Sequence, residues 1–168
     1  KAELQAVWQK ATAHLDYVTA WHRKALDYFV SVKGEFAFVS SNSVTQGEQV
    51  PDLFPDIRDA GWHIKFGHRT FYWINESASN ERAHVHCVIV GFTRDAGAKQ
   101  RLFNYPDRRT QTEVKVTEGI NGYLADAPAV YPTSRSQPIS PELAPVSFGS
   151  MPRDDGHLLI EPDDYAEV

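Results

Sequence analysis

The first third of the chain carries apolar residues at helical spacing. Between Asp16 and Val32 the spacing alternates between three and four positions, which predicts one amphipathic helix with its apolar face on Val18, Trp21, Ala25, Tyr28 and Val32. Asp16 can cap the start of this helix, and Gly34 can end it. The preceding residues 2–13 are also helix-prone but have a weaker pattern.

An unbroken apolar run from Phe36 to Val39 follows this helix. Such a run leaves little room for a solvent-facing side, so it predicts a central, parallel strand covered by helices on both faces. The polar residues 40–49 come next, and helical spacing then resumes from Val50 to Ala60. Within this second helix Pro55 predicts a kink or a restart, and Gly61 a stop.

A second strand is predicted from Trp62 to Phe66, and a long hairpin after it. The hairpin pairs the aromatic stretch Arg69–Ile74 with Ala83–Phe92, the strongest strand pattern in the chain. The order helix, strand, helix, strand, hairpin strand predicts an α/β fold, namely part of a doubly wound, Rossmann-like sheet with an antiparallel hairpin.

Beyond residue 100 the pattern weakens. Leu102–Tyr105 and Glu113–Val116 predict short strands, whereas residues 125–145 hold five prolines and predict an irregular, loop-rich segment.

Composition narrows the function. A net charge of -5 argues against coating nucleic acid with the whole surface, so any DNA contact must be local. The segment from Arg94 to Lys115 has three more basic than acidic residues and is the candidate for such a contact, although charged segments of this kind are more often solvated surface. No apolar run approaches the roughly 18 residues of a membrane span, and a single cysteine, Cys87, cannot form an internal disulfide. We expect a cytoplasmic protein without a membrane partner.

Complete catalytic signatures are missing from the sequence. It contains no glycine-rich dinucleotide loop, no phosphate-binding loop and no nucleophile elbow. His84 and His86 fall on the same side of a predicted strand, but a metal site needs a third ligand, so we interpret both as structural and expect no metal.

Two polar or aromatic clusters remain as binding candidates. The loop 40–49 follows a central strand, where open α/β sheets bind ligands, although the same residues could simply cap a helix. Phe71, Tyr72 and Trp73 are adjacent aromatics that cannot all enter one core from a strand, because neighbours alternate faces. One ring or more should be exposed or line a cleft, where it could stack on a nucleobase.

Six stretches resemble a known family: residues 15–18, 38–50, 68–73, 85–92, 123–128 and 149–158. They are similar to the type IIL and type IIG restriction-modification enzymes, single-chain N6-adenine DNA methyltransferases that use S-adenosylmethionine. The most specific are FVSSNSVTQGEQV and HRTFYW. In that family the cofactor loop and the catalytic Asn-Pro-Pro-aromatic motif lie upstream of the matching region, and Asn104-Tyr105-Pro106-Asp107 has the wrong order to replace the motif.

The resemblance implies a fragment of a longer methyltransferase. Residues 1–100 correspond to the later part of the catalytic domain, and residues 101–168 to the start of the DNA target-recognition region. Phe71 and Trp73 are two positions apart and therefore share one face of the strand. Both are then expected to stack on the flipped adenine. We expect the DNA contacts to come from basic residues near the hairpin: Arg69, Lys99, Arg101, Arg108 and Arg109.

The same resemblance assigns no catalytic, cofactor-binding or metal-binding residue to this chain. S-adenosylmethionine would bind the full-length protein, whose partners are double-stranded DNA and the rest of its own polypeptide, and the isolated chain is expected to be inactive. Two other functions stay open: a non-catalytic nucleic-acid-binding module that uses the same aromatics, and a metal-dependent hydrolase built on His84 and His86.

Overall fold

The computed structural model describes residues 2–10, 14–73 and 85–133, together with residues 135, 140 and 142. Its helices are α1 (Ala2–Trp8), α2 (Thr19–Tyr28), the short 3-10 helix η1 (Asn42–Thr45) and α3 (Gln49–Asp59). Its strands are β1 (Phe36–Ser41), β2 (His63–Trp73), β3 (Val85–Thr93), β4 (Arg101–Asn104) and β5 (Thr112–Val114). No helix among these residues is long and apolar enough to cross a membrane.

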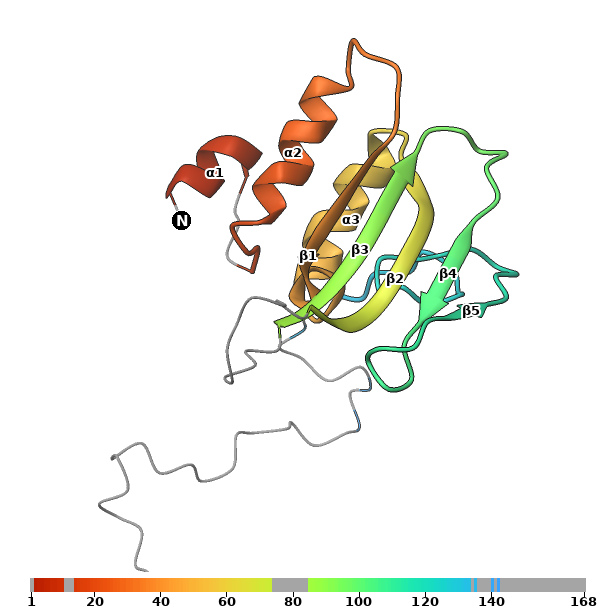
Figure 1. Cartoon of the computed structure of the whole chain (residues 1–168). Coiled ribbons are helices and arrows are strands. Elements are labelled where there is room, and N and C mark those ends of the chain that lie inside the picture. Colours follow the sequence, from red (N-terminus) through yellow and green to blue (C-terminus); the bar gives the residue numbers. More distant parts are fainter. Residues whose placement is uncertain are drawn as a thin grey trace, which may run out of the picture. The chain divides into compact units, whose positions relative to one another are not determined.

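The five strands form one mixed sheet in the order β1-β3-β2-β4-β5 (Figure 1). Strand β3 lies between β1 and β2 and runs antiparallel to both. Strand β4 is parallel to β2. Strands β1, β2 and β4 therefore share one direction, and their carboxyl ends meet at one edge of the sheet. The α/β fold with a partial doubly wound sheet and an antiparallel hairpin is confirmed.

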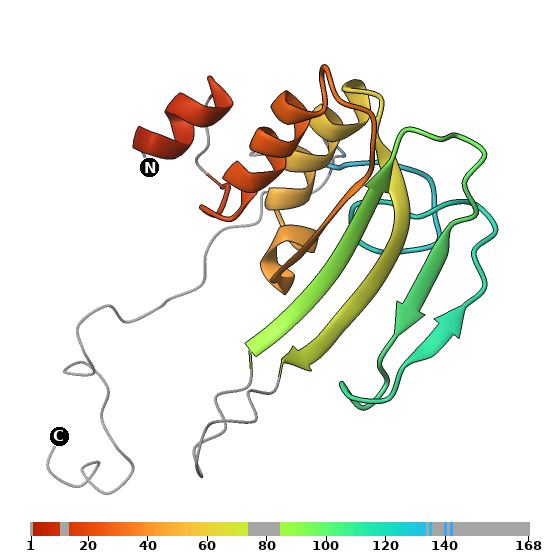
Figure 2. The same cartoon turned by 45° about the horizontal axis from the view of Figure 1, so that its top comes forward.

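One face of the sheet, which we call the covered face, packs against helices (Figure 2). Apolar residues at helical spacing on α3 supply Val50, Leu53, Phe54 and Ile57 to the core. Alternate residues of the strands, among them Val90, Phe92 and Leu102, meet them from the sheet and are at most 2% exposed. Burial of this kind contributes about 1.5–3 kcal/mol for each large apolar side chain.

The prediction of a central, parallel strand covered on both faces at Phe36–Val39 is wrong, although a strand does form there. Strand β1 is an edge strand of the described sheet and pairs antiparallel with β3. Phe36 and Phe38 face the core, whereas Ala37 and Val39 point to the opposite side and are exposed. A run of apolar residues is compatible with both a strand covered on two faces and a strand such as β1, whose second face is not covered by the described residues.

Helix α2 forms where the sequence predicted a helix, but it buries a different face. Its buried residues are Thr19, His22, Ala25 and Leu26, while Trp21 and Tyr28 of the predicted apolar face are 60% and 62% exposed. The predicted cap is also wrong, because Asp16 makes no capping bond. Its carboxylate accepts hydrogen bonds from the Ser43 hydroxyl (2.6 Å) and the Gln49 amide (2.8 Å).

Strand β2 joins two segments that the sequence analysis separated. It runs from His63 to Trp73 and is interrupted by irregular register between Ile64 and Phe66 and between His68 and Phe71. At the second irregularity three positions of β2 span two of β3, since His68 pairs with Ile89 and Phe71 with Cys87. This β-bulge places His68 and Phe71 on the same face.

Helix α3 continues through Pro55, so no restart occurs there. Gly61 follows the end of the helix with φ +84°, as predicted. The two short strands after residue 100 exist as β4 and β5. Both belong to the same sheet as β1, β2 and β3, and the compact unit extends to Thr133.

Candidate functional site

The face of the sheet away from the helices, which we call the open face, carries a row of aromatic rings. They come from β2, from β4 and from the residue that follows β4: Phe66, His68, Phe71, Trp73, Phe103 and Tyr105. The rings of His68 and Phe103 stack with centroids 4.5 Å apart, and Phe71 lies 5.2 Å from Tyr105. Strand alternation combined with the bulge of β2 assembles this row.

A hydrogen-bond chain fixes Tyr105 beneath Phe71. The Tyr105 hydroxyl lies 2.7 Å from His68 Nδ1 and donates to Gln111 Oε1 at 3.1 Å. Because the amide oxygen only accepts and the hydroxyl has one proton, His68 Nδ1 is the donor of the other bond. Burial, and then the charge of Arg101, lower the pKa of His68, so its ring stays neutral near pH 7.

The two rings expected to stack on a base lie next to each other. The centroids of Phe71 and Trp73 are 6.4 Å apart, and Trp73 is 50% exposed. Tyr72 points to the other side, where its ring lies 4.9 Å from that of His86, its cross-strand neighbour. The shared face of Phe71 and Trp73 is thus present, and their role as a base-stacking pair stays a prediction.

Two of the predicted basic residues meet at one cavity of about 190 Å³, which we call the arginine cavity. It is lined by Thr45, Gln46, Arg69, Thr70, Asn104, Arg108, Tyr123 and Leu124. These residues come from the end of η1, from the bulge of β2, from the end of β4 and from two later loops. The cavity therefore lies at the carboxyl ends of the parallel strands, where open α/β sheets bind ligands.

Both arginines are held by backbone carbonyls. Arg69 Nε donates to the Leu124 carbonyl at 2.8 Å, and Arg108 Nη1 donates to the Thr70 carbonyl at 3.1 Å. The backbone N–H of Tyr72 donates in turn to the Arg108 carbonyl at 3.0 Å, which ties the loop after β4 to β2.

The polar loop 40–49 makes no side-chain cap on η1 or α3, so the capping role is not found, and its ligand-binding role stays a prediction. Its middle is tied to Asp16 through Ser43, and the Thr45 hydroxyl donates to the Asn42 carbonyl at 2.9 Å, which stabilises the short helix η1. Its far end, Thr45 and Gln46, lines the arginine cavity.

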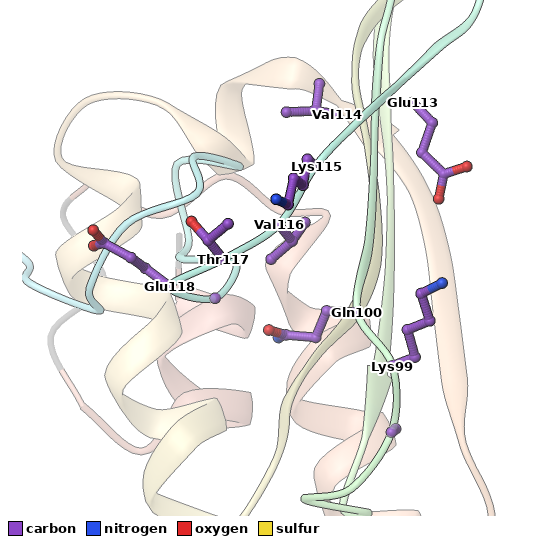
Figure 3. A pocket seen from close by; sticks show the side chains of 10 residues that line it. Lys99, Gln100, Glu113, Val114, Lys115, Val116, Thr117 and Glu118 are labelled. Carbon is purple, nitrogen blue, oxygen red and sulfur yellow. The ribbon is translucent and has the colours of Figure 1, made fainter.

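The other predicted DNA contacts lie elsewhere. Arg101 is on the open face and forms an ion pair with Glu113, with Nε 3.0 Å from Oε1. Lys99 lines a larger, open cavity of about 650 Å³ before the start of β4, where Lys99 and Glu113 point away from Gln100 and Val116 (Figure 3). The backbone N–H of Arg109 donates to Asp107 in a tight turn. The five predicted DNA-binding residues are thus not one cluster.

A metal site finds no support in the described ranges. Within residues 2–10, 14–73 and 85–133, no group of three His, Cys, Asp or Glu side chains could hold a metal ion. Of the two candidate histidines, His86 packs against Tyr72, and His84 lies outside the described residues.

Comparison with known proteins shows what this sheet belongs to. Residues 1–104 match the family model described as the MmeI DNA-methyltransferase domain. The chain belongs to the MmeI DNA-methyltransferase domain family. Its sequence and sheet are thus those of part of a methyltransferase domain, which agrees with the resemblance found in the sequence.

One named protein and one solved structure are similar to this member of the MmeI family. A protein named DNA methyltransferase A from Bacillus subtilis (strain 168) is 37% identical over 155 residues, which are 92% of this chain and 17% of that protein. The solved structure of the type IIL restriction-modification enzyme MmeI in complex with DNA matches 99% of this chain and 22% of its own, with 37% identity and a TM-score of 0.87. The chain spans about a fifth of the length of these relatives.

Sequence reasoning did not find three residues of the site. His68, Tyr105 and Gln111 form the chain that supports Phe71, and only the alternation of Phe103 and Tyr105 in a predicted strand hinted at it. No pattern signals the Leu124 carbonyl, because a backbone group reaches Arg69 across 55 residues of sequence only after folding.

Proposed function

We propose that this chain is part of an S-adenosylmethionine-dependent DNA methyltransferase that modifies adenine at N6 in a restriction-modification system. It contributes the later strands of the sheet, one wall of the pocket for the flipped base, and contacts to DNA. The catalytic motif and the cofactor site belong to other segments of the polypeptide.

One observation carries the proposal within this family: the pair of adjacent rings Phe71 and Trp73. They stand at the carboxyl end of β2, on the open face, and Trp73 is half exposed without a covering element among the described residues. A rigid aromatic face at this end of the sheet is what an extruded base needs for stacking.

The energies agree with a supporting role. Flipping a paired base out of the duplex costs a few kcal/mol, and stacking on an aromatic ring contributes about 1–3 kcal/mol per base. Stacking on Phe71 or Trp73 can thus offset most of the unpairing cost. It cannot make the exocyclic nitrogen nucleophilic, so the chemical step is assigned to groups outside this chain.

Neither the arginine cavity nor the larger cavity beside Lys99 fits S-adenosylmethionine. The arginine cavity offers two cations and no carboxylate to hold ribose hydroxyls or to face a sulfonium ion. The larger cavity beside Lys99 precedes β4 and lies at the amino end of that strand, opposite to the ligand-binding edge of such sheets. We derive no step of methyl transfer from residues of this chain.

Methyl transfer by the complete polypeptide tests the proposal. The protein is incubated with DNA and S-adenosylmethionine, and the digested nucleosides are analysed by mass spectrometry. We expect N6-methyladenine. Methylcytosine would contradict the adenine assignment, and DNA binding without any methyl transfer would favour a non-catalytic nucleic-acid-binding module.

The isolated chain tests the division of labour. Titration calorimetry with S-adenosylmethionine is expected to give no heat above background, because neither a glycine-rich loop nor the catalytic motif is present in the sequence. Micromolar binding by the isolated chain would show that the cofactor site has been assigned to the wrong segment.

A further inference from the structure

The arginine cavity has a charge that nothing in the described part of the chain compensates. Two of its eight lining residues are arginines and none is acidic. Among the described residues, neither Arg69 nor Arg108 has a carboxylate partner, whereas Arg23, Arg58 and Arg101 each do. A concave site with two guanidinium groups and no counter-charge has the chemistry that recognises an anion.

The guanidinium groups are preorganised before any ligand arrives. Each uses one N–H on a backbone carbonyl, Arg69 on Leu124 and Arg108 on Thr70. A guanidinium has five N–H donors in a rigid plane, so each arginine keeps donors for the cavity. Fixing the planes in advance lowers the entropy lost when a ligand is bound.

The loop that carries Leu124 is itself held firmly. The Asp126 carboxylate accepts hydrogen bonds from the backbone N–H groups of Thr117, Glu118 and Gly119, which hold its pKa at about 2. The Asn121 side chain accepts from the N–H groups of residues 123 and 125. Leu124 and Arg108 both adopt left-handed backbone conformations, with φ of 52° and 64°. Such strain persists only where surrounding bonds enforce it.

We propose that the arginine cavity binds a single backbone phosphate of the DNA, held jointly by Arg69 and Arg108. The inference rests on the function proposed above and adds the binding site of one DNA phosphate. Thr70 lines the cavity and directly precedes Phe71. The bound phosphate therefore belongs to the target nucleotide or to its neighbour, and the bulge of β2 couples phosphate binding in the arginine cavity to base stacking on the open face.

The remaining lining residues suit a phosphodiester. Gln46, Thr70, Asn104 and Tyr123 are neutral polar side chains with N–H or O–H groups that can donate to the non-bridging oxygens, and the cavity of about 190 Å³ is open to solvent. Arginine matches the planar, bidentate geometry of phosphate oxygens better than lysine does.

A chemical double-mutant cycle on the complete polypeptide tests the proposal. The DNA probes are duplexes with the target adenine in which one phosphate at a time is replaced by a neutral methylphosphonate. With the unaltered protein we expect one position, beside the target nucleotide, to weaken binding on the order of tenfold, because a charge-assisted contact is lost. In Arg69→Gln and Arg108→Gln that position should lose its special effect, while the other positions keep theirs.

Salt dependence gives an independent measurement. Each Gln variant should lower the slope of log binding constant against log salt by about one relative to the unaltered protein. Arg23→Gln is the matched control, because Arg23 is an exposed arginine on α2 that pairs with Asp27. Its salt slope and methylphosphonate profile should match those of the unaltered protein.

Three outcomes would overturn the inference. A flat methylphosphonate profile in the unaltered protein refutes it without any variant, and so does a profile that Arg69→Gln and Arg108→Gln leave unchanged. If either of these two profiles is found and the protein still methylates DNA, only the phosphate site is refuted and the proposed function stands. If the complete polypeptide does not bind DNA, the phosphate site and the proposed function are both refuted. Melting temperatures of the two variants show whether either has lost its fold. If one has, the methylphosphonate profile of the unaltered protein still tests the inference.

Discussion

The two faces of one sheet have different physical characters in this chain. The covered face is packed against α2 and α3, and its residues Phe92 and Leu102 are 1% and 0% exposed. The open face holds aromatic rings joined by stacking and hydrogen bonds, yet Trp73 and Val39 are each 50% exposed. Stability is concentrated on the first face, and the aromatic rings proposed to stack on a base lie on the second.

Two histidines, His22 and His68, follow the same division. His22 on the covered face is 2% exposed and lies 5.0 Å from the Phe38 ring, and burial lowers its pKa to about 4. His68 on the open face is only half-buried and hydrogen-bonds Tyr105. One histidine is enclosed by packing, while the other belongs to a polar chain that supports an exposed ring.

Removing a large ring from the covered face should produce the largest effect. Phe92→Ala leaves a cavity between Phe36, Phe54 and His22, and the expected loss of unfolding free energy is about 3–5 kcal/mol. Val39→Ala on the open face is the comparison, with an expected loss below about 1 kcal/mol because half of that side chain is already exposed. Urea denaturation measures both, and equal losses would contradict the division between the faces.

A titration effect of intermediate size should come from His22. Its pKa is about 4 in the folded protein and about 6.5 in the unfolded chain, so the unfolded state binds the proton first as pH falls. Stability should be full above pH 6.5 and decrease towards pH 4, by about 3 kcal/mol in total. His22→Leu should flatten this part of the profile. A profile unchanged in His22→Leu would refute this account of the buried ring.

The smallest expected changes in free energy come from substitutions on the open face, where they lower activity. In the complete polypeptide Phe71→Ala and Trp73→Ala should slow adenine methylation by about 5- to 150-fold, equivalent to about 1–3 kcal/mol of lost stacking. The loss should shrink when the target adenine is mispaired, because less unpairing energy is then required.

Tyr72→Ala is the matched control for these two variants, because Tyr72 lies on the opposite face next to His86. Its methylation rate should respond equally on paired and mispaired targets. If Phe71→Ala and Trp73→Ala instead lower the melting temperature and affect both targets alike, the rings are core residues and the pocket assignment is wrong.

Much of the fold could be predicted from the sequence because its signals are local. The helical spacing from Val50 to Ile57, the strand pattern from Val85 to Phe92 and the short strands after residue 100 all depend on neighbours within a few positions. The face of α2 could not be predicted. Trp21 and Tyr28 are apolar at helical spacing, yet the buried side carries Thr19 and His22, because packing against β1 and β3 selects the face.

The candidate site was predictable to a smaller extent. The sequence alone determined that Phe71 and Trp73 share a face, because side chains alternate along a strand wherever it lies. Only the tertiary structure decided which face that is, since the bulge after His68 adds one residue and moves Phe71 to the side of Tyr105. It also brought Arg69 to Arg108, and separated both from Arg101, through contacts between residues 38 to 55 positions apart. Local chemistry fixes which side chains a strand presents, whereas long-range pairing fixes what they meet.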